Sequence, residues 1–281
     1  MHQPGITLKS KHIIYWSYNE IINKNNNIKN YKNLYTINSL PSIDYIIYLK
    51  QKLLERDYML NIRNILKLNN NKCILYTTRP EFDKEYLCKI LDSCFMNNYN
   101  LVVIFHPRKR NNFINSLVSN KNNIKKIWNK SCEFIKTNFI ISDNSNLYEY
   151  MSYCDLLICP NKSTITIEAL ASNINTLFFG NKDDIEELSD KNPKKCTINL
   201  WKSNNKDKYD PFLLEKFGIS IISLNDFNDI NKHIKEYINN TKSSFNKESR
   251  NKLLLYFFNN NKFNENTASN KILDDLRSLM C

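Results

Sequence analysis

Glycine is scarce in this sequence. The 281 residues include only Gly5, Gly180 and Gly218. The G-x-G-x-x-G fingerprint of dinucleotide-binding proteins and the Walker A loop both need glycines within a few residues of one another, so neither is present. A G-x-S-x-G nucleophile elbow is absent for the same reason. These absences exclude the usual NAD-dependent oxidoreductases, P-loop ATPases and α/β-hydrolases.

The sequence also lacks clustered metal ligands. It contains no C-x-x-C pair and no Asp-x-Asp, so we expect no metal site, no disulfide framework and no tightly bound cofactor. Several cysteines lie within apolar runs and are expected to be reduced core thiols in a reducing compartment. The eight cysteines are Cys73, Cys88, Cys94, Cys132, Cys154, Cys159, Cys196 and Cys281.

No apolar run approaches the roughly 20 residues that span a bilayer, and residues 1–10 lack the apolar core of a secretion signal. Hydrophobic residues make up 42% of the chain, which is enough for a globular core. We therefore expect a soluble, cytoplasmic protein.

The formal net charge is +12, which suggests an anionic partner. Residues 106–132 contain seven basic residues and no acidic one. This segment is either an anion-binding face or a solvated helix surface. Nucleic acid is the least favoured partner, because the segment lacks aromatic residues arranged for base stacking.

From residue 73 onward, short apolar runs alternate with amphipathic stretches, a pattern that predicts βαβ units and a doubly wound parallel sheet. The runs do not alternate apolar with polar, as expected for strands covered on both faces. The expected strands are residues 73–77, 101–105, 139–141, 155–159 and 176–179. The expected helices between them are residues 81–96, a basic segment after Pro107, 146–154 and 164–172.

The flanks of this core have patterns of their own. We predict a strand at 11–16 and one long helix at 43–68 before the core, then a strand at 219–223 after it. Helices are expected at 226–239, 245–258 and 268–280. The predicted organisation is a bridging segment at 1–70, a Rossmann-like domain at 71–240 and C-terminal helices at 241–281.

Polar residues follow each predicted strand, and in an open parallel sheet the carboxyl ends of the strands meet at one ligand-binding edge. The expected site residues at these ends are Thr78 and Arg79, His106, Pro107 and Arg108, Ser142 and Asp143, and Ser163 and Thr164. Residues 161–164 and 180–182 follow the predicted strands at 155–159 and 176–179.

The strongest of these signals lies at residues 159–170, where a strand breaks at Pro160 and a helix opens at Ser163 or Thr164. Free backbone amides and the positive helix end would there form a phosphate cradle. Ordinary capping of the helix by Ser163 is the alternative. Glu168, one turn into the helix, could accept hydrogen bonds from ribose hydroxyls.

His106 ends an apolar strand, and Pro107 forces the chain to leave that strand in an extended conformation. The imidazole could therefore donate to a phosphate or act as an acid at the edge of the sheet, unless it is satisfied locally. Arg108 could make a bidentate phosphate contact or be exposed to solvent.

Several of these motifs, at residues 74–79, 103–108, 147–158 and 163–169, together resemble the C-terminal donor-binding domain of bacterial surface-polysaccharide glycosyltransferases of the two-Rossmann-domain (GT-B) kind. That family includes teichoic-acid-type glycerophosphotransferases and capsule sialyl- and polysialyltransferases. The resemblance covers roughly residues 73–181. It implies that His106, Ser163 and Thr164 contact donor phosphates and that Glu168 contacts the ribose.

The resemblance implies transfer of a sugar or glycerol-phosphate unit from a CMP-, CDP- or UDP-linked donor to a polysaccharide or lipid-linked acceptor. His106 is the candidate catalytic residue. The alternatives are a non-catalytic nucleotide-sugar-binding subunit and an enzyme similar to UDP-sugar 2-epimerases, whose glycine-rich donor loop is missing here.

Members of this family carry an acceptor-binding domain before this region. We therefore expect the chain to be a piece of a longer protein, a split subunit whose protein partner supplies that domain, or a shortened protein with an altered function. His2 and residues 39–44 are imperfect matches to the family's bridging segment. Basic segments and the aromatic stretch 253–258 suggest a peripheral association with the inner face of the plasma membrane, where lipid-linked acceptors lie.

Overall fold

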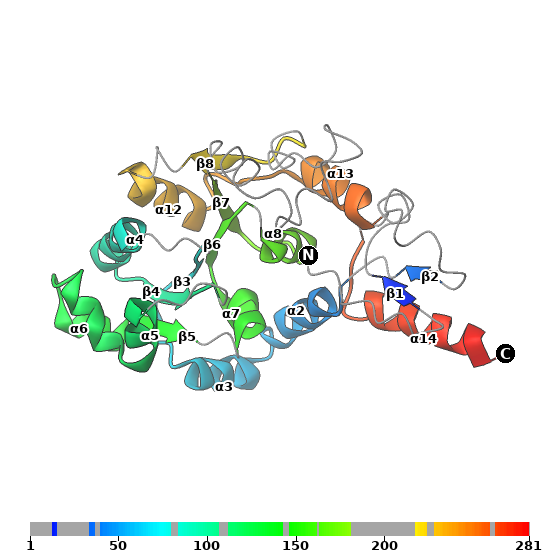
Figure 1. The fold of residues 1–281 in the computed structure, drawn as a ribbon, viewed down its shortest axis with the longest axis horizontal. Helices are drawn as coiled ribbons and strands as arrows, with labels where there is room; N and C mark the ends of the chain where they lie inside the picture. Colours follow the sequence, from blue (N-terminus) through cyan, green and yellow to red (C-terminus); the bar gives the residue numbers. More distant parts are fainter. Residues whose placement is uncertain are drawn as a thin grey trace.

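The computed structural model describes residues 13–15, 34–36, 40–79, 84–106, 112–142, 146–161, 163–180, 217–223, 228–258 and 262–280. Its centre is a six-stranded sheet in which every strand pair is parallel (Figure 1). The strands are β3 (Cys73–Thr77), β4 (Asn100–Ile104), β5 (Phe139–Ser142), β6 (Leu156–Pro160), β7 (Thr176–Gly180) and β8 (Ile221–Ser223). These bounds lie within two residues of the predicted ones.

The strand order is β5-β4-β3-β6-β7-β8. The chain winds outward from β3 to β5, returns to the other side of β3 with β6, and then winds outward again to β8. The predicted doubly wound, Rossmann-like sheet is therefore confirmed. The reversal of direction puts a topological switch point between β3 and β6, where Tyr76 pairs with Ile158.

Helices cover both faces of the sheet, which explains the unbroken apolar strands: every residue of β3, β4, β6 and β7 is buried. One face packs against α4 (Lys84–Asn97), α5 (Asn112–Ser119), the 3₁₀ helix η2 (Lys121–Lys126), α6 (Cys132–Thr137) and α12 (Ile230–Ile238). The other face packs against α2 (Pro41–Lys52), α3 (Arg56–Leu66), α7 (Leu147–Tyr153), α8 (Thr164–Ala171) and α13 (Lys247–Phe258).

The prediction of a single helix at 43–68 is wrong. The chain forms two helices, α2 and α3, and Glu55, just before α3, has an extended backbone (ψ 119°). The buried faces explain the break. Leu49 and Ile62 both pack into the core, but thirteen residues at about 100° each would turn Ile62 roughly 140° away from Leu49 in one continuous helix. The turn at 53–55 brings both side chains onto the sheet.

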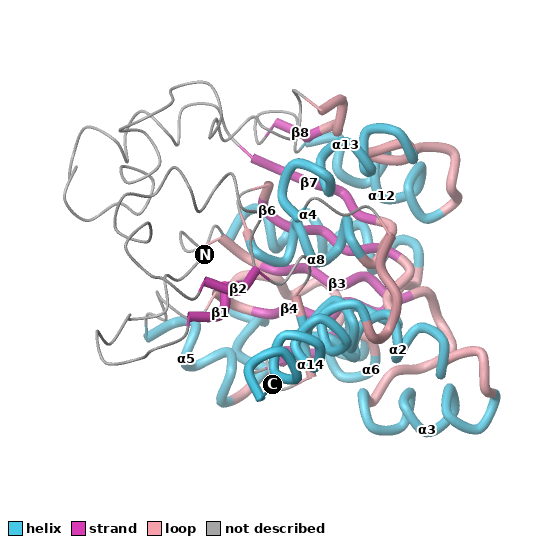
Figure 2. The backbone as a smooth tube through the Cα atoms, turned by 90° about the vertical axis from the view of Figure 1, so that its right-hand side faces the viewer, coloured by secondary structure: helices cyan, strands magenta, loops and turns pink. Residues whose placement is uncertain are grey.

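The two ends of the described chain meet away from the sheet. The C-terminal helix α14 (Thr267–Met280) lies along α2, and β1 (Ile13–Tyr15) pairs in parallel with β2 (Leu34–Thr36) nearby (Figure 2). The carboxylate of Asp44, on α2, accepts hydrogen bonds from the amides of Ala268 (2.8 Å) and Ser269 (3.1 Å) at the start of α14. Asp44 therefore caps a helix that lies 224 positions further along the chain.

The aromatic stretch at 253–258 lies on α13, where Leu255 is exposed and three other residues are buried. Leu253, Leu254 and Phe258 are buried in the core beneath α13. Within the described residues, none of the helices combines the length and the apolar character needed to cross a bilayer.

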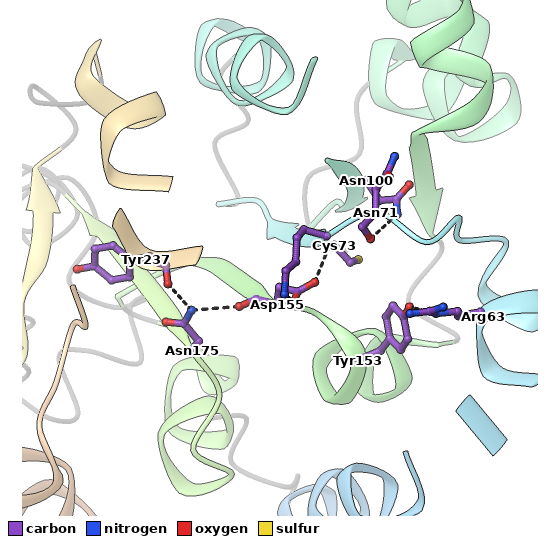
Figure 3. Close-up of polar contacts among 9 residues, drawn as sticks. Arg63, Asn71, Cys73, Asn100, Tyr153, Asp155, Asn175 and Tyr237 are labelled. Carbon is purple, nitrogen blue, oxygen red and sulfur yellow. Dashed lines mark hydrogen bonds and ion pairs between the residues drawn. The ribbon is translucent and has the colours of Figure 1, made fainter. Parts of the chain in front are cut away.

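Polar side chains tie the strands together at the amino edge of the sheet (Figure 3). The carboxylate of Asp155 accepts from the backbone amide of Cys73 (2.8 Å) and from Lys72 Nζ (2.6 Å). Asn175 Nδ2 donates to the carbonyls of Asp155 (3.1 Å) and Tyr237 (2.9 Å). These bonds fix β3, β6, β7 and α12 at one edge of the sheet.

Candidate functional site

The polar residues that end β3, β4 and β6 meet beside the switch point. Thr77 and Thr78 end β3, His106 follows β4, and Asn161 and Ser163 follow β6; we call this region the switch crevice. The backbone amide of His106 donates to Thr78 Oγ1 (3.0 Å), and the amide of Thr78 donates to the carbonyl of Ile104 (3.0 Å). Thr78 therefore fixes the direction in which β4 leaves the sheet and places the half-buried His106 beside β3.

Thr77 has an unsatisfied hydroxyl. The residue is only 3% exposed, and its Oγ1 has no hydrogen-bond partner within the described part of the chain. Alternation along β3 puts its side chain on the same face as Cys73 and Leu75, which is the face that α7 and α8 cover. A buried hydroxyl without a partner costs about 1–3 kcal/mol, so a polar ligand that reaches it would be bound more tightly.

The amino end of α8 follows β6 and has no side-chain cap. Ser163 occupies the cap position in an extended conformation (φ −107°, ψ 152°), but its side chain makes no capping hydrogen bond. Thr166 Oγ1 instead donates to the carbonyl of Pro160 (2.7 Å) and holds the turn between strand and helix. Among the described residues, the alternative of ordinary capping by Ser163 is therefore not observed, and the positive end of α8 carries no side-chain cap.

Gly180 allows Asn161 to lie across the end of β7. A Cβ atom on Gly180 would come within 2.4 Å of Asn161 Oδ1. Asn161 is 8% exposed, and its backbone amide donates to the carbonyl of Phe179 (2.9 Å). The absence of a side chain at Gly180 thus leaves room for Asn161 at the end of β7, although the sequence contains no phosphate-binding glycine loop.

Glu168 lies one turn into α8 and is buried, at 5% exposure. Its Oε1 accepts hydrogen bonds from Ser42 Oγ on α2 (2.5 Å) and from the Tyr148 hydroxyl on α7 (3.4 Å). Burial raises the pKa of the Glu168 carboxyl, and these two bonds partly oppose the increase. Glu168 thus joins α8 to α2 and α7. A ribose could reach its Oε1 only by replacing one of these two protein hydroxyls.

The remaining predicted site residues are placed as follows. Arg79 follows Thr78 at the end of β3. Ser142 ends β5, where it pairs with Ile104 of β4 and lies two strands away from β3. The backbone of Thr164 begins α8, but its side chain is outside the described set. Pro107, Arg108, Asp143 and His2 lie outside the described residues.

Some basic side chains of the predicted basic face at 106–132 bind other parts of the protein. Lys121 Nζ donates to the carbonyls of Lys136 (2.9 Å) and Phe139 (3.0 Å), and Lys130 pairs with Asp92 (2.7 Å). Three of the seven basic residues, at 108–110, lie outside the described residues. The described part of this segment therefore packs α5, η2 and α6 onto the sheet.

The thiols of the switch-point strands are unreactive. Cys73 and Cys159 are fully buried, and burial raises the pKa of both thiols. Cys154 has its pKa raised to about 12, also chiefly by burial. Cys132 differs from the expected core thiols because it is exposed. In the regions that the structure describes, no group of three or more His, Cys, Asp or Glu side chains could hold a metal ion.

Sequence reasoning missed Ser42 and the contact between Asn161 and Gly180. Ser42 is 126 positions away from Glu168, and no local pattern around either residue indicates that they meet. The sequence analysis also did not predict the contact of Gly180 with Asn161. Two signals were available: both residues follow predicted strands, and glycine is scarce in this sequence.

No protein-family model and no curated protein sequence matches this chain. Among solved structures, it is similar to the wall teichoic acid polymerase TagF, with 15% identity, a TM-score of 0.47, and coverage of 96% of this chain and 58% of the other. It is similar to UDP-GlcNAc 2-epimerase from Neisseria meningitidis, with 14% identity, a TM-score of 0.48, and coverage of 87% and 55%. It is also similar to a glycosyltransferase from Rickettsia africae ESF-5, with 15% identity, a TM-score of 0.46, and coverage of 98% and 65%. The chain spans less than two thirds of the length of each of these proteins.

Proposed function

We propose that the switch crevice binds the phosphate groups of a nucleotide-activated sugar or glycerol-phosphate donor, and that the chain serves in transfer of that unit to a polysaccharide or lipid-linked acceptor. One observation carries the proposal. At the switch point of a doubly wound sheet, the uncapped end of the helix that follows β6 lies next to β3, whose last residue, Thr77, has a buried hydroxyl with no partner among the described residues. Both features favour a ligand that is anionic and accepts hydrogen bonds.

The chemistry of such a transfer suits these groups. The acceptor hydroxyl attacks the donor and releases its proton to solvent, the bond to the nucleotide breaks, and the departing phosphate oxygen keeps the electron pair. The amino end of α8 and the hydroxyls of Thr77 and Ser163 would stabilise that growing negative charge. His106, held beside β3 by its backbone bond to Thr78, would donate to the same phosphate or protonate it.

Calorimetric titration of the chain with CMP, CDP, UDP and GDP tests the proposal, using Thr77→Val and Ser163→Ala. We expect one nucleotide class to bind and each substitution to weaken binding about tenfold, or about 1.4 kcal/mol. Thr77→Val should leave the unliganded protein equally or more stable, because it removes an unpaired buried hydroxyl.

The matched control is Ser119→Ala, since Ser119 is an exposed serine on α5 whose hydroxyl bonds only within its own helix. Failure of every nucleotide to bind, or binding that both crevice substitutions leave unchanged, would refute the proposal. Binding without transfer of the donor unit, even when partner proteins are present, would identify the chain as a non-catalytic binding subunit.

A further inference from the structure

A cavity lies at the opposite edge of the sheet from the switch crevice. It has a volume of about 520 Å³ and lies where α8 and α12 end and α13 begins, next to the chain that leads into β7. Figure 3 shows one of its lining residues, Asn175, bonded between Asp155 and Tyr237. Cavities of this size hold small ligands in other proteins.

The lining of this amino-edge cavity is cationic. Lys242, Lys247 and Arg250 line it, and no carboxylate is among its lining residues. Lys242 pairs with Glu236 (3.1 Å), whereas Lys247 is exposed and has no hydrogen bond or ion pair to any residue that the structure describes. Lys247 is also the first residue of α13, where the helix dipole disfavours a cation. An anion in the cavity would relieve this local excess of positive charge.

Arg250 is held in a fixed orientation. Its Nε donates to the carbonyl of Leu170 (2.5 Å) and its Nη2 to the carbonyl of Ala171 (2.6 Å), at the end of α8. Lys50 Nζ donates to the next two carbonyls, of Ser172 (3.0 Å) and Asn173 (3.1 Å). The terminal carbonyls of α8 are therefore already paired with cations and would not repel an anion. A guanidinium has five N–H donors, so Arg250 keeps donors for a ligand.

The rest of the lining suits a sugar ring. Phe245 contributes a half-buried aromatic ring whose position is supported by Phe178, with ring centroids 6.5 Å apart. Asn173 and Asn240, which follow α8 and α12 in left-handed conformations, add amide groups that both donate and accept. An aromatic face with amides beside it offers both apolar and hydrogen-bonding contacts to a polyol.

We propose that the amino-edge cavity binds an anionic sugar, namely a sugar that carries a phosphate or carboxylate group. The anionic group pairs with Lys247 and Arg250, and the ring packs on Phe245. Such a ligand is either a free monosaccharide derivative or the end of an acidic oligosaccharide. This proposal is independent of the nucleotide site, because the two regions lie at opposite edges of the sheet.

Calorimetric titration of the full chain with glucose 6-phosphate, glucuronate, an oligogalacturonate, glucose and inorganic phosphate tests it. We expect an anionic sugar to bind with a Kd of about 1 mM or lower, and glucose and inorganic phosphate to bind at least about tenfold more weakly. Lys247→Glu and Phe245→Ala should each weaken binding by about tenfold or more. Tighter binding of the oligogalacturonate would identify the end of an acidic oligosaccharide as the ligand. Tighter binding of a monosaccharide would identify a free monosaccharide derivative as the ligand.

Two controls separate this site from other sources of binding. Lys126→Glu makes the same charge change on η2, at an exposed lysine outside the cavity, and should leave affinity unchanged. Ser163→Ala should also leave it unchanged, so that failure of this proposal and failure of the nucleotide proposal remain distinguishable. Absence of binding by every anionic sugar, equal binding of inorganic phosphate, or binding that survives both cavity substitutions would overturn the proposal.

Discussion

At the residue scale, Gly180 is needed for its lack of a side chain. In Gly180→Ala, the new methyl group would lie within 2.4 Å of Asn161 Oδ1, so Asn161 must move out of its buried position. We expect a loss of about 1–3 kcal/mol in the free energy of unfolding and weaker nucleotide binding. Urea denaturation and calorimetric titration measure the two effects.

Gly218→Ala is the control for that substitution. Gly218 has a φ of 74° and lies near Ser249, so alanine would be strained there as well. We expect Gly218→Ala to lower stability without changing nucleotide affinity. Equal effects of both substitutions on affinity would show that loss of stability, and not the position of Asn161, controls binding.

Glu168 predicts a pH dependence. Because burial raises the pKa of this carboxyl above its usual value of 4.5, the folded protein binds the proton more tightly than the unfolded chain does. This contribution to stability is fully present below the unfolded pKa and is lost as the pH rises through the folded pKa. Glu168→Gln, which stays neutral, should therefore gain stability relative to the wild type as the pH rises.

Urea denaturation of both proteins at a series of pH values from about 4.5 to 8 measures that difference. Taking the difference removes the effect of the other titrating groups, which the two proteins share. A difference that stays constant over the whole series would contradict the assignment of a raised pKa to Glu168.

The sequence predicts some of these residues better than others. Thr78, His106 and Ser163 follow apolar runs, and the geometry of a parallel sheet brings the ends of such runs to one edge. Glu168 was expected to face a ribose, but Ser42 already donates to it. That contact depends on how α2 packs against α8, which no local pattern specifies.

At the scale of elements, the two ends of α8 differ. Its amino end lacks a side-chain cap and opens on the switch crevice, whereas Lys50 of α2 and Arg250 of α13 bind its last carbonyls. The two cations come from opposite ends of the sequence. Both cations also interact favourably with the negative end of the helix dipole.

Lys50→Met should therefore destabilise the protein. Methionine keeps the apolar stem but leaves the carbonyls of Ser172 and Asn173 without their donor, which should cost about 1–3 kcal/mol in the free energy of unfolding. Lys52→Met on the same helix removes only a solvent-exposed pair with Glu55 and should cost much less than Lys50→Met does. Chemical denaturation of the two variants makes the comparison, and equal losses would contradict it.

Secondary-structure elements were predicted well where a single physical rule determines their sequence pattern. A strand covered on both faces is a short apolar run, and all the core strands were found in this way. The break between α2 and α3 was missed because residues 53–55 include no glycine or proline. It arises because Leu49 and Ile62 must both reach the same face of the sheet, which is a tertiary requirement.

At the scale of the whole molecule, Asp44 joins α2, near the beginning of the sheet domain, to the C-terminal helix α14. Asp44→Ala removes the acceptor for the first amides of α14 and should cost about 0.5–2 kcal/mol, as loss of a helix cap does. Hydrogen exchange followed by mass spectrometry should show faster exchange in α14 and unchanged exchange in β3 and β6. Asp57→Ala, at an exposed aspartate on α3, should leave α14 unaffected.

The pairing of Lys50 and Arg250 with α8 also bears on where this protein can be cut. A recombinant fragment limited to residues 71–240 keeps all the strands of the large sheet but loses both cations that hold the far end of α8. It also loses Ser42, which donates to Glu168 on the same helix. The smallest fragment that preserves the geometry of the switch crevice should therefore begin before α2 and extend into α13.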